Sequence, residues 1–252
     1  MPDTPTFTVE TTAEPVGETL IVALPQLGMA NLTAVDYLVQ HGTSEEMGYL
    51  DTEDLPAMTP VQDGAPRRHT RLFDLHDTGC TALLGELFIP VWAAGGFVDA
   101  LADWVVETPL EEILVLHGVP FPHAETEHTV LTVATPDFQE RRLAGTEFEG
   151  LRGGFFDGVP GELLDRNLDE ADLPVGTLVT PTHPPGPDID ASIRLLEAFQ
   201  TIYGLEIDLD ELEEAAEQTR QYYGELADRM QALQAADEGL GSRDYPEDRM
   251  YM

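Results

Sequence analysis

Four histidines stand at or near the ends of predicted strands or in the loops beside them: His117, His123, His128 and His183. Residues 123–128, His-Ala-Glu-Thr-Glu-His, combine two imidazoles with two carboxylates, which are donor types that zinc binds. A metal site needs at least three such side chains to converge, together with outer partners that orient them. The spacing matches no standard motif, so we interpret 123–128 as a solvated loop and expect neither a metal nor a cofactor.

Signals for nucleophilic or phosphate chemistry are weak elsewhere. The turn at residues 25–31 stands where a phosphate-binding loop would, but it has one glycine and no Lys-Ser or Lys-Thr pair. Cys80 has no Cys-X-X-Cys partner, and no serine lies in a Gly-X-Ser-X-Gly context. The basic run at 67–71 is expected to pair with nearby carboxylates. We therefore expect a protein that is not an enzyme.

The charge of the chain is strongly one-sided. Its 252 residues contain 48 Asp and Glu against 12 basic residues, all of them Arg, which gives a formal net charge of −36. We expect no nucleic-acid binding, because contacts to phosphates need clustered positive charge. A hydrophobic content of 42% is typical of a folded domain, so the acidity belongs on its surface. We interpret this surface as halophilic, because concentrated salt screens such self-repulsion.

The location of the protein is predicted from two further features. No apolar run approaches the roughly 18 residues that a membrane-spanning helix requires, and residues 1–17 carry acids and prolines where an export signal would have an apolar stretch. The single Cys80 permits no intramolecular disulfide, which is consistent with a reducing compartment. We expect a soluble cytoplasmic protein without membrane contact.

Alternating strand and helix signals fill the first two thirds of the chain. Buried strands are predicted at 19–24, 47–50, 80–88, 112–117, 129–135 and 176–180, with a hairpin pairing 58–62 and 67–75 across Asp63-Gly64. Helices are predicted at 32–40, with Asn31 as the N-cap, at 92–107 and at 161–167. The alternation predicts an α/β fold with a mixed or largely parallel sheet and helices on both of its faces.

The last third of the chain is predicted to be helical. One helix runs from Ile189 to Tyr203, capped by Asp188 or Asp190 and stopped by Gly204. The next opens at Asp208 and carries about three heptads of apolar residues, which pack on the core or on a neighbouring subunit: Leu212, Ala216, Thr219, Tyr223, Leu226, Met230 and Leu233. We divide the chain into a polar lead-in (1–17), an α/β core (18–205), a C-terminal helix (206–236) and a flexible tail (237–252).

The end of the given sequence is its most specific feature. A polar, Gly- and Pro-containing segment from Asp237 leads to Met250-Tyr251-Met252, a hydrophobic residue followed by a tyrosine and one further residue. An extended tether of this length reaches roughly 50 Å, far enough for its end to enter a pocket on a partner. These three residues are therefore the candidate partner-binding site.

Several segments resemble the archaeal proteasome assembly chaperone family, and the charge suggests a haloarchaeal member. The resemblance spans residues 18–234 and rests on these motifs: Leu20-Ile21-Val22-Ala23-Leu24-Pro25-Gln26-Leu27-Gly28, Ala34-Val35-Asp36-Tyr37-Leu38, Leu114-Val115-Leu116-His117-Gly118, Pro187-Asp188-Ile189-Asp190-Ala191-Ser192 and Tyr203-Gly204-Leu205-Glu206-Ile207-Asp208-Leu209-Asp210-Glu211-Leu212. None of them is a catalytic signature. Gln26 stands where relatives usually have glycine, and Ile189-Asp190 departs from the usual Pro-Asp-Pro-Lys-Ala-Ala pattern.

The resemblance implies a fold similar to nucleoside phosphorylases and a role on the proteasome core particle. It implies a homo-oligomer, or a hetero-oligomer with a paralogue, whose Met250, Tyr251 and Met252 tails dock between α subunits of the outer ring. Tyr251 would pack and donate a hydrogen bond, and the Met252 carboxylate would meet a basic side chain. The alternative is an enzyme of the same fold, acting on a small nucleoside or carboxylate substrate, with the four histidines lining a pocket at the strand ends.

Overall fold

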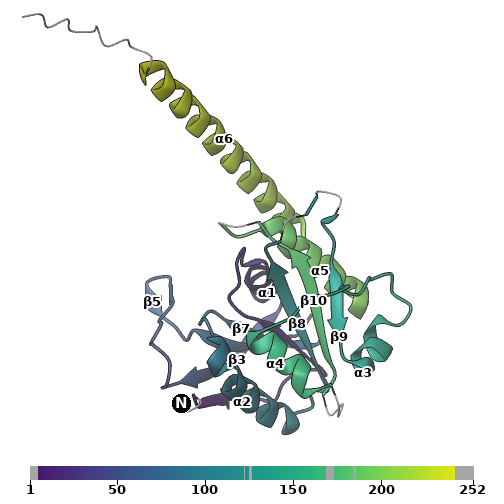
Figure 1. The fold of residues 1–252 in the computed structure, drawn as a ribbon. Helices are drawn as coiled ribbons and strands as arrows, with labels where there is room; N and C mark the ends of the chain where they lie inside the picture. Colours follow the sequence, from purple (N-terminus) through teal and green to yellow (C-terminus); the bar gives the residue numbers. More distant parts are fainter. Residues whose placement is uncertain (1–4, 122, 125–126, 169–172, 184–185, 242–252) are drawn as a thin grey trace, which may run out of the picture. The chain divides into compact units, whose positions relative to one another are not determined.

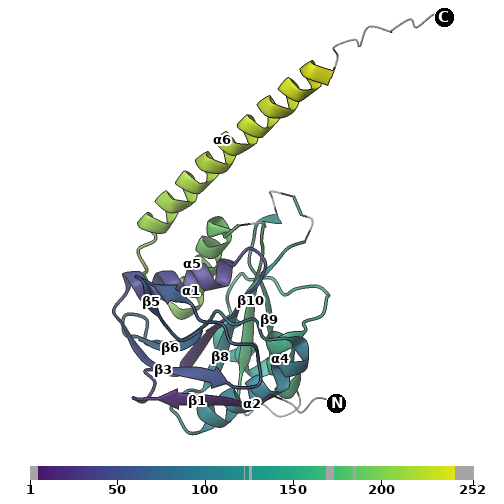
Figure 2. The same ribbon diagram turned by 90° about the vertical axis from the view of Figure 1, so that its left-hand side faces the viewer.

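A computed structural model describes residues 5–121, 123–124, 127–168, 173–183 and 186–241, and the side chains of 227–228 and 231–241 are not included in the description. The chain divides into two units, Met1–Leu209 and Asp210–Met252, which we treat separately. The first unit holds an α/β sandwich, which confirms the predicted fold class. Figure 1 and Figure 2 show its sheet and helices from two directions.

One mixed sheet forms the centre of the first unit. Its strand order is β1-β3-β6-β7-β2-β8-β10-β9, with bounds β1 Phe7–Thr11, β2 Thr19–Ala23, β3 Ser44–Thr52, β6 Thr70–Leu75, β7 Cys80–Gly85, β8 Glu112–Val119, β9 Leu131–Ala134 and β10 Val175–Pro181. The central strands β7, β2, β8 and β10 are parallel, and antiparallel pairs flank them on both sides. The fully buried residues of β2 reflect this central place, since both faces of the strand are covered.

Helices cover both faces of the sheet. On one face, α1 (Ala30–His41) and α5 (Ile189–Tyr203) pack on each other and over the parallel strands. On the other, α2 (Ala94–Val106), preceded by the short η1 (Val91–Ala93), and α4 (Gly158–Arg166) close the main hydrophobic cluster. Side chains alternate between the two faces of the sheet along β2, and Leu20 and Val22 are on the face that belongs to this cluster. Short turns at Pro136–Phe138 (α3) and Gln139–Leu143 (η3) follow β9.

The N-terminal stretch and the predicted hairpin differ from expectation. Residues 7–11, inside the expected lead-in, form the edge strand β1, because Phe7 is buried and packs edge-on against Phe97 with ring centroids 5.4 Å apart. Across Asp63-Gly64 only β4 (Val61–Gln62) and β5 (Ala65–Pro66) pair. The predicted longer hairpin is wrong, since β6 pairs with β3 and β7 and is buried in the main sheet.

The caps of two helices show one correction and one confirmation. Asn31 is not the N-cap of α1, which is Met29 in the left-handed region at φ 45°. The Asn31 side chain is instead buried and donates to the Leu24 carbonyl at 2.6 Å. For α5, the Asp188 side chain accepts from the Ala191 amide at 2.9 Å, and Gly204 ends the helix at φ 65°, both as predicted.

The second unit is described by a single helix, α6 (Asp210–Gly241). Its end lies beyond residue 236, where we expected the tail to begin. Ion pairs one turn apart, Arg220 with Glu217 and Arg229 with Glu225, support the helix. Of the apolar residues predicted to pack along this helix, Tyr223, Leu226 and Met230 are exposed in the structure, and the Leu233 side chain lies outside the described residues.

Candidate functional site

A cleft of about 320 Å³ opens at the carboxyl ends of β2 and β8. Open α/β sheets commonly bind ligands at this edge, where the loops leaving parallel strands separate. The cleft is lined by the turn after β2, by the end of β8, by residues 88–91 and by the start of α4. The main polar side chains in it are Gln26, His117 and Asp157.

Gln26 fixes the state of His117. The Gln26 amide Nε2 donates to His117 Nδ1, and its Oε1 accepts from the Gly118 backbone amide at 2.7 Å. The imidazole proton therefore resides on Nε2 of His117. Burial lowers the pKa of His117 to about 4, so the ring is neutral at pH 7, and Phe156 packs against it with ring centroids 5.1 Å apart.

The chemistry available in this cleft is limited. Its described lining residues comprise a neutral imidazole and an exposed carboxylate, and they include no serine, cysteine or lysine that could act as a nucleophile. Its rim is apolar and open, because Leu27, Phe88 and Val91 are 63%, 67% and 59% exposed. A cleft with these features is suited to binding an apolar side chain of another protein.

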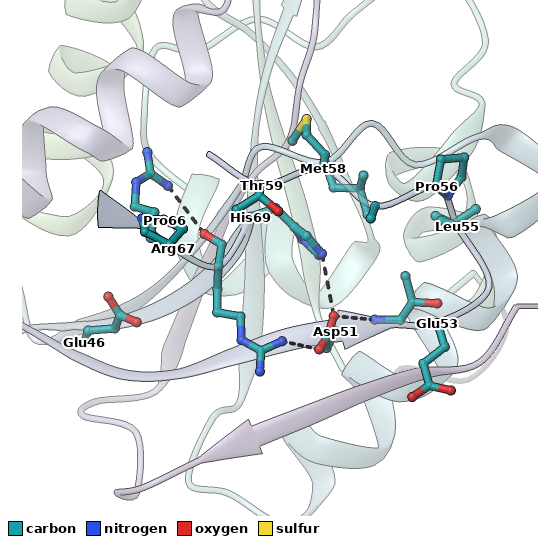
Figure 3. Close-up of a pocket in the computed structure, with 14 residues that line it drawn as sticks. Glu46, Asp51, Glu53, Leu55, Pro56, Met58, Thr59, Pro66, Arg67 and His69 are labelled. Carbon is teal, nitrogen blue, oxygen red and sulfur yellow. Dashed lines mark hydrogen bonds and ion pairs between the residues drawn. The ribbon is translucent and has the colours of Figure 1, made fainter. Parts of the chain in front are cut away.

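A second, larger cavity of about 660 Å³ lies beside the basic run (Figure 3). Arg67 pairs with Glu86. Arg68 pairs with Asp51, which also lies 3.7 Å from His69 Nε2. The expectation that these cations pair with carboxylates is confirmed. Burial lowers the pKa of His69, so this wall of the cavity offers little net positive charge to an external anion.

The four candidate histidines divide into two groups. His117 lines the cleft, whereas His123, His128 and His183 contact one another, with ring centroids 4.8 to 5.0 Å apart. The lining residues of the cleft include none of these three. The remaining candidates, Met250, Tyr251 and Met252, lie outside the described residues.

Sequence reasoning missed two side chains that orient these histidines. Gln26 contacts His117 across 91 sequence positions, whereas the sequence marks it only as a departure from the family pattern. Asp188 was expected as a helix cap, but its Oδ2 also accepts from His183 Nδ1 at 2.7 Å. The spacing of Asp188 and His183, five positions apart beside a helix start, is a local signal that could have revealed the second pair.

Comparison with known proteins identifies the family. The model of the PAC2 family matches residues 20–227, and the chain belongs to that family, which confirms the resemblance. No curated protein matches the chain significantly. Among the described residues, no helix has both the length and the apolar character to cross a membrane.

Several solved structures share the fold. PbaA of Pyrococcus furiosus, described as an archaeal homolog of proteasome-assembly chaperone, matches with a TM-score of 0.78 and 18% identity, over 92% of this chain and 97% of that one. PbaB of the same organism, described as an archaeal proteasome activator, matches with a TM-score of 0.75 and 20% identity, over 88% and 99%. A PAC2 family protein from Streptomyces avermitilis matches with a TM-score of 0.63 and 20% identity, over 84% and 97%.

Proposed function

We propose that this protein is a non-enzymatic chaperone or accessory factor of the proteasome core particle, acting in the cytoplasm. The observation that carries the proposal is the PAC2 match over 20–227, supported by nearly complete coverage of the PbaA and PbaB chains. Those two proteins are described respectively as a homolog of proteasome-assembly chaperone and as a proteasome activator. Both descriptions name the proteasome, and we transfer that common partner to this chain.

The contact that we propose first is made by Met250, Tyr251 and Met252. Met250 fills an apolar notch between α subunits of the core particle, and Tyr251 packs there while donating a hydrogen bond. The protein acts as a homo-oligomer, or with a paralogue, so that several weak contacts to a ring of repeated pockets add through effective concentration. The strong negative charge selects α subunits that carry basic side chains at those pockets.

The folded unit supplies a second contact. Leu27, Phe88 and Val91 expose apolar surface around one cleft, although the chain as a whole carries a net charge of −36. A contiguous apolar rim on a highly charged protein is characteristic of a protein-binding surface. The neutral His117 inside the cleft adds no charge that would have to be desolvated on binding.

The test is binding to purified cognate core particle in molar salt, with peptide hydrolysis read in the same samples. We compare the full chain, a chain ending at Arg249, Tyr251→Ala and the matched control Tyr245→Ala, which alters the same residue type in the same segment. Truncation and Tyr251→Ala should each weaken binding by at least about tenfold, equivalent to about 1.4 kcal/mol, and Tyr245→Ala should leave it unchanged.

The outcomes separate the two contacts. Equal binding by all four forms would refute tail docking and move the interface to the folded unit, where Phe88→Ser should then weaken binding. No binding by any form would refute the proteasome proposal. The alternative, a small-molecule enzyme using the His117 cleft, would then be tested by a ligand screen that reads the melting temperature.

A further inference from the structure

Three histidines meet where two connections leave neighbouring strands. His123 and His128 lie in the connection from β8 to β9, and His183 lies in the connection from β10 to α5. β8 and β10 are parallel and in register up to Val119 and Pro181, so both connections start at the same edge of the sheet. The fold therefore brings together side chains that are as many as 60 positions apart in the sequence.

The three rings are arranged as a nearly equilateral triangle. The centroid separations are 4.8 Å for His123 and His128, 4.9 Å for His123 and His183, and 5.0 Å for His128 and His183. In a tetrahedral zinc site the metal lies about 2.0 Å from each ligating nitrogen, which places two ligating ring centroids roughly 5.2 Å apart. One ring nitrogen from each histidine already lies within 4.8 Å of the others. Modest side-chain rotation brings these nitrogens to the roughly 3.3 Å spacing of such a site.

Hydrogen bonds orient two of the rings so that one nitrogen stays available. His123 Nδ1 lies 2.6 Å from the Phe121 carbonyl, and His183 Nδ1 lies 2.7 Å from Asp188 Oδ2. Both partners are acceptors, so each Nδ1 carries the proton and each Nε2 holds a lone pair. Carbonyl and carboxylate partners of this kind are the usual outer shell of metal-bound histidines.

The His123 ring contains an unexplained buried atom. Its Nε2 is buried and has no hydrogen-bond partner in the described part of the chain. A buried acceptor left without a partner is uncommon in folded proteins, because nothing offsets the loss of its hydrogen bonds to water. A cation bound between the three rings would satisfy this lone pair.

From this geometry we propose that His123, His128 and His183 form a binding site for a first-row transition-metal dication of the zinc class. Three imidazoles leave a fourth coordination position open for water or an anion. Nitrogen donors favour Zn²⁺, Co²⁺, Ni²⁺ or Cu²⁺ over Mg²⁺ and Ca²⁺, which prefer oxygen ligands. The bound ion links the β8–β9 connection to the start of α5.

Two charged side chains act on the cluster with opposite sign. Asp188, whose side chain is only 6% exposed, faces His183 and partly neutralises the ion. Arg194 interacts with His128 unfavourably, but its guanidinium is held by Thr180 Oγ1 at 3.0 Å and by the Pro181 carbonyl at 2.8 Å. The net charge of −36 on the chain raises the local concentration of cations and offsets this repulsion.

The experiment titrates Co²⁺ and then Zn²⁺ into the untagged full chain after chelator treatment and removal of the chelator. We expect one Co²⁺ per chain, with the visible ligand-field absorption of a tetrahedral site, and displacement by one equivalent of Zn²⁺. The variants His123→Ala, His128→Ala and His183→Ala should each weaken binding by more than the roughly 10- to 100-fold that loss of an outer-shell partner causes. The matched control His76→Ala changes an exposed histidine outside the cluster and should bind as the parent does.

Asp188→Asn tests the role of Asp188 as a positioning residue. Asparagine is as good an N-cap as aspartate, so it should still accept from the Ala191 amide and keep the start of α5. Its amide nitrogen cannot accept from the His183 backbone amide as Asp188 Oδ2 does at 2.8 Å, so the metal-free melting temperature should fall modestly. Metal affinity should also fall about 10- to 100-fold, because the carboxylate that orients His183 is lost. A fall in the metal-free melting temperature without a change in affinity would contradict this role.

The proposal is overturned if the parent chain binds no stoichiometric ion. It is also overturned if the three histidine variants, shown by circular dichroism to be folded, bind as tightly as His76→Ala. If a variant does not fold, the replacement of that histidine by Gln takes its place in the comparison. Zn²⁺ should also raise the melting temperature of the parent and of His76→Ala but not of the three histidine variants. None of these readouts depends on proteasome binding.

Discussion

A fully buried carboxylate at the start of β8 offers the sharpest test of how this fold is held together. Glu112 has no exposed surface, and its oxygens accept from Thr19 Oγ1 at 2.7 Å, from Tyr203 Oη at 2.9 Å and from Arg142 Nε at 2.8 and 3.0 Å. Arg142 is the cation hydrogen-bonded to this carboxylate and the main balance to its charge, whereas Arg141 Nη1 lies 3.8 Å away. The Arg142 guanidinium also lies over the Tyr203 ring, 4.7 Å from the centroid. The group ties the sheet to η3 and to the end of α5.

Arg142→Met should remove the balancing charge while keeping the aliphatic part of the side chain. Breaking a buried ion pair from one side costs about 3–5 kcal/mol, because the remaining charge is left uncompensated. The Arg142 side chain is 25% exposed, so water replaces part of the lost contact. We therefore expect the free energy of unfolding to fall by about 3 kcal/mol, which is a large share of the stability of a typical domain.

The assay is urea unfolding at a fixed molar salt concentration, which keeps charge screening constant. Arg141→Met is the comparison variant, because Arg141 is 39% exposed, pairs at 3.1 Å with the exposed Glu111 and lies 3.8 Å from Glu112, beyond hydrogen-bond distance, so its loss should cost less than about 1 kcal/mol. Adding Glu112→Gln to Arg142→Met should recover about 1–2 kcal/mol, since the buried charge is then gone. Equal losses for Arg141→Met and Arg142→Met, or no recovery in the double variant, would refute the reasoning.

Three further predictions concern pH, packing and salt. Above pH 6.5 the His117 imidazole is neutral in both the folded and the unfolded state, but between pH 6.5 and about 4 only the unfolded chain binds the proton. Relative to His117→Gln, the parent should therefore lose up to about 3 kcal/mol of stability on acidification in paired denaturation curves, and His76→Gln should not change this loss. Gly176→Ala places a Cβ 2.3 Å from the buried Phe138 ring and should lower the free energy of unfolding by about 1–3 kcal/mol. Gly224→Ala in α6, where the added Cβ meets open space, should not be destabilising, and equal effects of the two substitutions in thermal unfolding would contradict this packing argument. The melting temperature should rise between about 0.2 and 2 M KCl, because the Debye length falls from roughly 7 Å to about 2 Å and the repulsion within the net charge of −36 is screened. A melting temperature that stays constant or falls with added salt would refute the halophilic interpretation.

Local signals in the sequence predicted most of the elements of the fold. β2, β8 and β10 are short apolar runs bounded by turn residues, and the structure places each within two residues of its expected bounds. The start and end of α5 followed from Asp188 and Gly204, whose roles depend on backbone geometry within a few residues. Features of this kind need no knowledge of the tertiary structure.

Pairings between distant segments could not be predicted in the same way. β1 has only one buried aromatic residue, Phe7, and its place at the sheet edge depends on contact with Phe97. The pairing of Gln26 with His117 and the convergence of the three histidines depend on which strands are neighbours in the sheet. Strand order is set by packing of the whole unit, and hydrophobic periodicity carries no information about it.

The carboxyl edge of the parallel strands holds both the His117 cleft and the starting points of the two connections that carry the other histidines. The proposed docking segment at 250–252 belongs to a different unit of the chain. Truncation at Arg249 therefore leaves every proposed metal ligand in place, and substitution of the histidines leaves the docking segment intact. Because the two sets of residues are separable, an effect of Zn²⁺ on core-particle binding that persists in the truncated chain would have to act through the folded unit.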